Sequence, residues 1–142
     1  MKIDVFKASD LMELDEQEAT QWLRAYVRPE HAAALERGMS YTARVDGKIV
    51  VCAGVVEHWE GRGEAWAFLA KDSGKHFVAI HRAVKRFLDV CPIKRIEAAV
   101  DYEFEPGHEW VTMLDFKIEA QRMRGYFPDG RDATLYARVR VE

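Results

Sequence analysis

The residues best suited to chemistry lie in a short polar loop from Lys71 to His76. Residues 64–70 before it form an apolar run with two aromatic side chains, and from Phe77 onward apolar residues recur at helical spacing. This pattern predicts a strand, a tight loop and a helix. The first turn of a helix has unpaired backbone N–H groups and the positive end of the helix dipole, so a glycine-containing loop there can bind a phosphate or pyrophosphate.

Three residues of the loop support anion binding. Gly74 would let the backbone approach a phosphate, and Lys71 and Lys75 would add positive charge. The alternative is an ordinary connection between a strand and a helix, in which Ser73 is the N-cap residue. The loop by itself leaves both interpretations open.

Composition limits the classes of protein to which the chain can belong. With 142 residues, 49% hydrophobic and 32% charged, we expect one soluble domain over residues 1–142 with a substantial core. A net charge of −3 gives no general argument for a nucleic-acid partner or an anionic membrane. No apolar run has the length of a membrane span and no signal peptide is evident, so we expect a cytoplasmic protein. Cys52, Cys91 and the histidines show no metal-ligand spacing, so we predict two buried thiols and no metal site.

The order of predicted elements indicates a single α/β (α+β) domain. Asp46-Gly47 supplies the positive φ angles of a tight hairpin turn, and Pro29 and Gly38 suit the start and end of a helix. A proline after Cys91 ends the central helix. We expect the order β-α-α-β-β-β-α-β-α-β-β in a mixed, mostly antiparallel sheet with helices on both faces. The predicted segments are strands 3–6, 41–45, 48–58, 64–70, 93–100, 117–126 and 133–141, and helices 11–26, 29–37, 74–90 and 108–116.

This order resembles the GNAT (Gcn5-related N-acetyltransferase) superfamily over nearly the whole chain. Within that superfamily, the chain is most similar to small, divergent GNAT-like proteins of tailed bacteriophages. The likeness is carried by an early acidic helix, a hairpin at residues 41–47 followed by Val-Cys-Ala-Gly-Val, the strand Glu-Ala-Trp-Ala-Phe-Leu, and the segment 110–116. The resemblance implies acetyl-CoA as co-substrate, with residues 69–77 around its pyrophosphate and pantetheine, namely Leu69, Ala70, Lys71, Ser73, Gly74, Lys75, His76 and Phe77.

Three positions depart from the motifs of that family. Its phosphate loop matches at Lys71 and Gly74, but His76 stands where a very small residue is usual. Phe104 replaces the asparagine of a later motif, and Val111 occupies the position where many members have an acid tyrosine. Since a valine cannot protonate a leaving thiolate, an enzyme of this kind would need water or Tyr102 for that proton.

The resemblance also implies a catalytic base near the start of the strand that ends at Ala70. Glu64 opens that strand, and Glu57 and His58 end the preceding one, although all three are also ordinary residues for exposed strand ends. The strand would be splayed from its neighbour, and a backbone N–H near Leu69 or Ala70 would polarise the thioester carbonyl.

Two functional hypotheses follow. The first is an acetyl-CoA-dependent N-acyltransferase that transfers acetyl to an amine by direct attack, with acyl-CoA and an amine acceptor as partners. The second is a catalytically inactive GNAT-fold protein that serves in phage virions, in assembly or in interactions, with phage structural proteins as partners. The first places the protein in the cytoplasm and the second also in the virion. The sequence leaves a homodimer open.

Overall fold

The computed structural model describes residues 1–14 and 29–140, which fall into two compact units. Unit 1 comprises residues 1–56 and 65–91, and unit 2 comprises residues 57–64 and 92–142. Most of the helix predicted over residues 11–26 lies outside the described residues. That residues 1–142 form a single domain remains a prediction.

Seven strands form one sheet in the order β1-β2-β3-β4-β5-β7-β6. The pairs β1–β2, β2–β3, β5–β7 and β6–β7 are antiparallel, whereas β4 and β5 are parallel. The predicted mixed, mostly antiparallel α/β fold is therefore confirmed. The elements are β1 (Lys2–Val5), α1 (Asp10–Glu13), α3 (Pro29–Glu36), β2 (Met39–Val45), β3 (Lys48–Trp59), β4 (Arg62–Leu69), the 3-10 turn η1 (Ser73–His76), α4 (Phe77–Val90), β5 (Arg95–Asp101), α5 (Glu105–Met113), β6 (Lys117–Met123) and β7 (Ala133–Val139).

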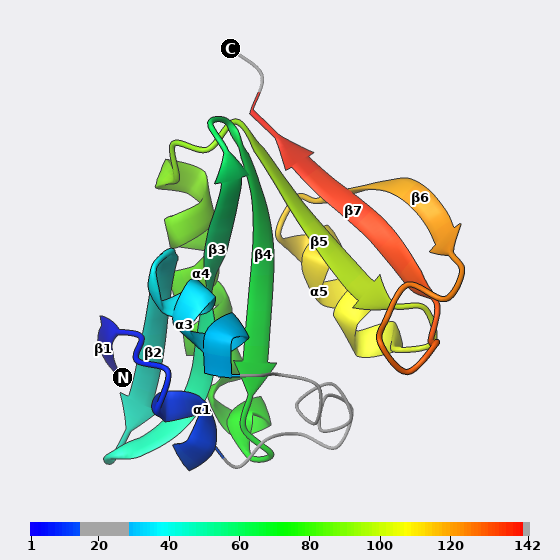
Figure 1. Cartoon of the computed structure of the whole chain (residues 1–142). Helices are drawn as coiled ribbons and strands as arrows, with labels where there is room; N and C mark the ends of the chain where they lie inside the picture. Colours follow the sequence, from blue (N-terminus) through cyan, green and yellow to red (C-terminus); the bar gives the residue numbers. More distant parts are fainter. Residues whose placement is uncertain (15–28, 141–142) are drawn as a thin grey trace. The chain divides into compact units, whose positions relative to one another are not determined.

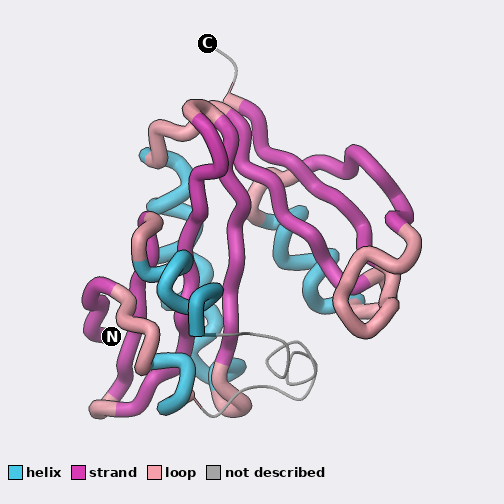
Figure 2. Tube along the Cα trace, viewed as in Figure 1, coloured by secondary structure: helices cyan, strands magenta, loops and turns pink. Residues whose placement is uncertain are grey.

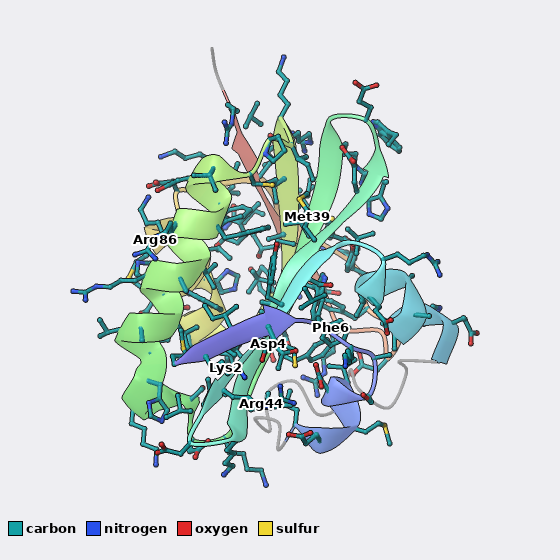
Figure 3. The ribbon with its side chains drawn as sticks, turned by 90° about the vertical axis from the view of Figure 1, so that its left-hand side faces the viewer. Lys2, Asp4, Phe6, Met39, Arg44 and Arg86 are labelled. Carbon is teal, nitrogen blue, oxygen red and sulfur yellow. The ribbon has the colours of Figure 1, made fainter. Side chains whose placement is uncertain are left out.

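In unit 1, helices cover both faces of the strands (Figure 1). Helices α1 and α3 lie on one face and α4 lies on the other, as Figure 3 also shows from the side of β1. Apolar side chains of α1, α3 and the strands form a buried core in this unit. This core contains Phe6, Leu11, Leu14, Ala32, Ile49, Cys52, Phe68 and Ala70.

The hairpin between β2 and β3 has the predicted turn. Asp46 and Gly47 have φ values of 52° and 80°, which a tight turn between two twisted strands requires. Further along the hairpin, Gly54 is needed for another reason, because a Cβ there would lie 2.5 Å from the carbonyl oxygen of Met39. A side chain at this position would push the two strands apart.

Asp10 attaches α1 to the sheet. Its carboxylate accepts hydrogen bonds from the backbone N–H of Lys7 (3.0 Å), from Thr42 Oγ1 (2.7 Å) and from an Arg44 guanidinium nitrogen (3.3 Å). Burial alone would raise the pKa of Asp10, but these donors hold it below its usual value. The carboxylate is therefore a structural anion in a largely enclosed position.

Unit 2 consists of the end of the β3–β4 hairpin, α5 and the strands β5, β7 and β6 (Figure 2). Helix α5 begins at Glu105, earlier than the predicted residue 108, because Pro106 fits the first helical turn and does not break it.

Gly107 is close to its neighbours: a Cβ there would lie 2.8 Å from a methyl group of Val100. The strands β6 and β7 end at Met123 and Val139, before the predicted residues 126 and 141.

A half-buried histidine, His108, joins α5 to β7. His108 Nε2 donates to the carbonyl oxygen of Tyr102 at 2.9 Å, because a carbonyl can only accept. His108 Nδ1 therefore accepts from the Tyr136 hydroxyl at 2.7 Å. Burial raises the pKa of Tyr136, and the charge of Glu105 adds to this effect, so the hydroxyl keeps the proton that it donates. This arrangement is consistent with a structural role for His108.

Candidate functional site

The predicted loop between strand and helix lies entirely in unit 1. Strand β4 ends at Leu69, and the N–H of Ala70 donates to the carbonyl oxygen of Val50 at 2.9 Å. A 3-10 turn, η1, then precedes α4, which starts at Phe77 with His76 in the N-cap position. The predicted helix start at residue 74 thus falls inside a tighter turn that begins at Ser73, and Ser73 is buried there instead of capping α4.

Gly74 has an unusual environment among the glycines. Its φ lies outside the left-handed region, and a Cβ built on it has no described atom within 4 Å. By contrast, Gly47, Gly61, Gly125 and Gly130 have positive φ, and a Cβ on Gly38, Gly54 or Gly107 would lie within 3 Å of a neighbour. Neither a positive φ nor a close neighbour therefore explains the glycine at position 74.

Charged side chains surround the loop. Asp72 Oδ2 lies 3.3 Å from Lys48 Nζ and 3.9 Å from Lys75 Nζ, and the hydrogen bond from Lys48 lowers the pKa of Asp72. The other carboxylate oxygen, Oδ1, is buried without a hydrogen-bond partner among the described residues. Lys71 and Lys75 are exposed, whereas His76 is only half-exposed. With three lysines and one aspartate the loop region has an excess of positive charge, which suits a pyrophosphate ligand.

The four candidate catalytic residues all lie in unit 2, and the structure brings two of them together. His58 Nε2 lies 3.6 Å from Glu64 Oε1, and both side chains are partly exposed. The other carboxylate oxygen, Glu64 Oε2, accepts from the hydroxyl of Tyr126 at 3.5 Å. Burial raises the pKa of Tyr126, and the negative charge of Glu64 raises it further, so the phenol stays protonated.

Glu57 and Tyr102 have other contacts. The carboxylate of Glu57 accepts from the backbone N–H of Gly61 at 3.1 Å and so closes the turn between β3 and β4. The ring of Tyr102 lies 4.4 Å from the guanidinium carbon of Arg122, and its carbonyl accepts from His108. Of these four described residues, only Glu64 and His58 thus lie within ion-pair distance of each other, and their catalytic role stays a prediction.

An ion-pair network lies beside Glu64 where β4 begins. Strand β4 pairs with β5 through residues 62–64 against residues 95–97, so Glu64 is opposite Glu97. Arg62 holds Glu97 with two hydrogen bonds of 2.7 and 3.0 Å, and Arg95 adds a third of 2.7 Å. These cations lower the pKa of Glu97 to about 2. The network fixes the start of the strand on which Glu64 stands.

Tyr126, which contacts Glu64 in the structure, was not singled out from the sequence. It is 62 residues from Glu64 along the chain, and it follows β6 in the connection to β7. The only local signal is an aromatic pair, Tyr126 and Phe127, before Pro128, and that pair is equally typical of a packed turn. The contact with Glu64 depends on how the sheet assembles, which the local sequence does not encode.

No helix in the described part of the chain is long and apolar enough to cross a bilayer.

Comparison with known proteins gives similarity in structure alone. No protein-family model matches the sequence, and no curated protein has a significantly similar sequence. Among solved structures, Ard1 from Thermoplasma volcanium is 16% identical with a TM-score of 0.79, and the match covers 99% of this chain and 98% of that one. The protein yncA from Salmonella typhimurium, solved with its cofactor acetyl-CoA, is 13% identical with a TM-score of 0.75, covering 100% of this chain and 95% of that one.

A third similar structure is the ribosomal-protein-S18-alanine N-acetyltransferase from Escherichia coli. It is 18% identical with a TM-score of 0.70, and the match covers 96% of this chain and 91% of that one. Identities this low establish similarity of fold and leave the chemistry to be argued from the site. The chain described here has the fold of the GNAT N-acetyltransferases.

Proposed function

We propose that this protein is an N-acetyltransferase that uses acetyl-CoA and transfers the acetyl group directly to an amine. The main support for the proposal is the environment of Gly74. Its φ is not positive and a Cβ there would meet no described atom, so neither backbone conformation nor packing requires a glycine. Since the fold gives no reason for a glycine there, a ligand that approaches the backbone is a better explanation. The acetyl-CoA bound to yncA supports acetyl-CoA as that ligand.

We assign pyrophosphate binding to the loop from Lys71 to His76. Lys71 and Lys75 are exposed and can reach an anion outside the loop, while Gly74 keeps the backbone accessible. Asp72 would repel a phosphate, but its charge is offset by Lys48 and Lys75. His76 is the last residue of the same turn.

The hydrogen bonds of β4 help to choose which backbone N–H, that of Leu69 or that of Ala70, could donate to the thioester carbonyl. Ala70 donates its N–H to Val50 on β3, so it is already used. Because backbone N–H groups alternate in direction along a strand, the N–H of Leu69 points away from β3. Leu69 is therefore the better candidate to polarise the carbonyl during amine attack.

Glu64 is the proposed base. As the amine nitrogen forms its bond to the acetyl carbon and the carbon–sulfur bond breaks, the amine proton passes to the Glu64 carboxylate. His58 at 3.6 Å orients this carboxylate and can pass the proton on to solvent. The thiolate of the leaving coenzyme takes a proton from the Tyr126 hydroxyl or from water, a role that Val111 cannot fill.

Titration calorimetry with acetyl-CoA tests the proposal, with Gly74→Glu as the diagnostic variant. A carboxylate at this position blocks the approach of the backbone to the pyrophosphate and repels it, so affinity should fall at least tenfold, about 1.4 kcal/mol. The thermal midpoint should stay unchanged, because a side chain here meets no described atom. Val90→Glu is the matched control, since it adds the same charge to an exposed position at the other end of α4.

Two results would reject the assignment. Absence of binding at millimolar acetyl-CoA in the unmodified protein would remove the enzyme proposal. Equal affinity in Gly74→Glu and Val90→Glu would place any bound ligand away from this loop. A companion variant, His76→Gly, restores the residue type usual in the family and should preserve or strengthen binding among folded molecules.

A second candidate function is a GNAT-fold interaction protein without catalysis, including the virion or assembly role predicted above. Val111 favours this non-catalytic role. Its side chain is only 9% exposed and has no proton to donate at the position in α5 where a tyrosine acid would be expected. Phe104 favours it as well, since its ring packs where a Cβ on Gly107 would be. Lack of acetyl-CoA binding together with recovery of the protein from purified phage particles would support this role.

A further inference from the structure

The outer edge of β1 is exposed. β1 is the first strand in the sheet order, and each of its four residues is exposed. Figure 3 looks onto this edge, with Lys2 and Asp4 labelled in front of the sheet. Ile3 and Val5 are 49% and 67% exposed, which is high for aliphatic side chains in a strand. An exposed edge of this kind can pair with another strand.

The direction of the backbone groups on this edge follows from one hydrogen bond. The N–H of Phe6 donates to the carbonyl oxygen of Ser40 on β2 at 3.1 Å. Because N–H and C=O groups alternate in direction along an antiparallel strand, Lys2 and Asp4 also direct theirs toward β2. Ile3 and Val5 therefore direct their N–H and C=O groups outward from the sheet.

The apolar and the charged side chains of β1 lie on opposite faces of the strand. Asp4 is paired with Thr42, whose hydroxyl bonds Asp10, so Lys2 and Asp4 lie on the face covered by α1. Val5 is paired with Tyr41, whose ring packs against Phe87 of α4. Ile3 and Val5 consequently form an apolar row on the α4 face, and Lys2 and Asp4 form a charged row on the other face.

We propose that β1 pairs antiparallel with β1 of a second copy of this chain, with the two-fold axis between the two Ile3 residues. In this register each Ile3 N–H donates to the Ile3 carbonyl of the other copy, and each Val5 N–H donates to the Met1 carbonyl of the other copy. These are the groups that point outward. A two-fold axis at Lys2 or Asp4 would instead bring together groups already directed toward β2.

The same register matches the side chains. Lys2 of each copy lies opposite Asp4 of the other, Ile3 lies opposite Ile3, and Val5 lies opposite Met1. Within one chain Lys2 has Arg44 as its neighbour on β2, a second cation, and its own Asp4 at 4.0 Å. The Asp4 of the second copy supplies another anion there. A charged edge often prevents self-association, but this sequence is self-complementary about Ile3.

The dimer should be weak. A short strand pair buries less area than a standard interface, so we expect a dissociation constant on the order of 10–100 μM. Analytical ultracentrifugation from 5 to 500 μM protein, in about 50 mM salt to limit screening, would measure it. A protein that remains monomeric at the highest concentration would overturn the proposal.

Ile3→Pro tests the backbone pairing. Proline removes the outward N–H of residue 3 and leaves the hydrogen bonds to β2 intact, so the monomer should keep its circular dichroism spectrum while the dissociation constant rises at least tenfold. Ile118→Ser is the matched control, because Ile118 is also an exposed strand residue but lies on β6 at the other end of the sheet order. Equal dissociation constants for the two variants would contradict pairing through β1.

A charge exchange tests the register without depending on proline. Lys2→Asp alone places two carboxylates opposite each other at both ends of the strand pair, so it should raise the dissociation constant at least tenfold. The double variant Lys2→Asp with Asp4→Lys restores opposite charges and should return the constant to within about threefold of the original. If the double variant dimerises no better than Lys2→Asp, the proposed register is wrong.

Discussion

Replacing Glu97 by glutamine tests the ion-pair network at the start of β4 and β5. Glu97 is 8% exposed and accepts three hydrogen bonds from Arg62 and Arg95. Glu97→Gln keeps the shape of the side chain but removes its charge, which leaves the two guanidinium groups beside a neutral amide. We expect a lower free energy of unfolding, because the arginines are then partly buried without their shared anion.

The magnitude follows from the pKa of Glu97. Hydrogen bonding by Arg62, and then by Arg95, lowers this pKa from 4.5 to about 2 against the opposing effect of burial. That difference corresponds to about 3 kcal/mol of stability at pH 7, and solvent screening at the rim of the site reduces it to about 2–3 kcal/mol. Because the folded-state pKa is the lower one, this stability is complete above about pH 4.5 and is lost as the pH falls toward 2.

Urea unfolding of both proteins between pH 7 and pH 2 measures the effect. The difference in unfolding free energy between the original protein and Glu97→Gln should be constant from pH 7 to about pH 5 and should shrink below that. Glu119→Gln is the control, since Glu119 also binds Arg95, at 3.0 Å, but is more exposed and should matter less. A difference independent of pH, or an equal loss in the control, would refute the reasoning.

Four shorter predictions concern single side chains. Gly54→Ala should destabilise the protein by about 1–3 kcal/mol in urea unfolding, because the new Cβ would lie 2.5 Å from a carbonyl oxygen. Tyr136→Phe should cost about 1–3 kcal/mol in the same assay, since His108 Nδ1 loses its donor. Cys52, buried and with a pKa raised to about 11, should react with iodoacetamide at pH 8 only after unfolding, as mass spectrometry of the alkylated peptide would show. Tyr126→Phe should lower the acetylation rate at least tenfold and leave acetyl-CoA affinity unchanged, if Tyr126 protonates the thiolate.

Local signals in the sequence were enough for several elements. The turn at Asp46 and Gly47 was predictable because an Asp-Gly pair readily adopts the two consecutive positive φ angles of a tight hairpin turn, and both residues have positive φ in the structure. Helix α4 was predictable from its apolar period, and Cys91 ends it before a proline as expected. By contrast, the start of α5 at Glu105 was missed, since Pro106 has the same sequence signal in a loop and in a first helical turn.

Glycines show why the candidate site was harder to predict. In the sequence, Gly38 suited a helix cap, but its φ is not left-handed, and a Cβ there would lie 2.6 Å from the carbonyl oxygen of Val55. Its requirement is thus the close approach of β3, which depends on tertiary packing. Gly74 suited either a turn or a ligand loop, and the structure was needed to show that positive φ does not explain this glycine.

A resemblance to a family predicts where an element lies along the chain more reliably than it predicts which side chain supplies a given chemical group. At the position of the family's acid tyrosine, Val111 is buried, so α5 contributes to packing and offers no proton there. A hydroxyl is nevertheless present at Glu64, supplied by Tyr126 from the connection between β6 and β7. Since a proton donor is defined by its distance and its pKa, the loss of one motif tyrosine does not by itself abolish catalysis in this fold.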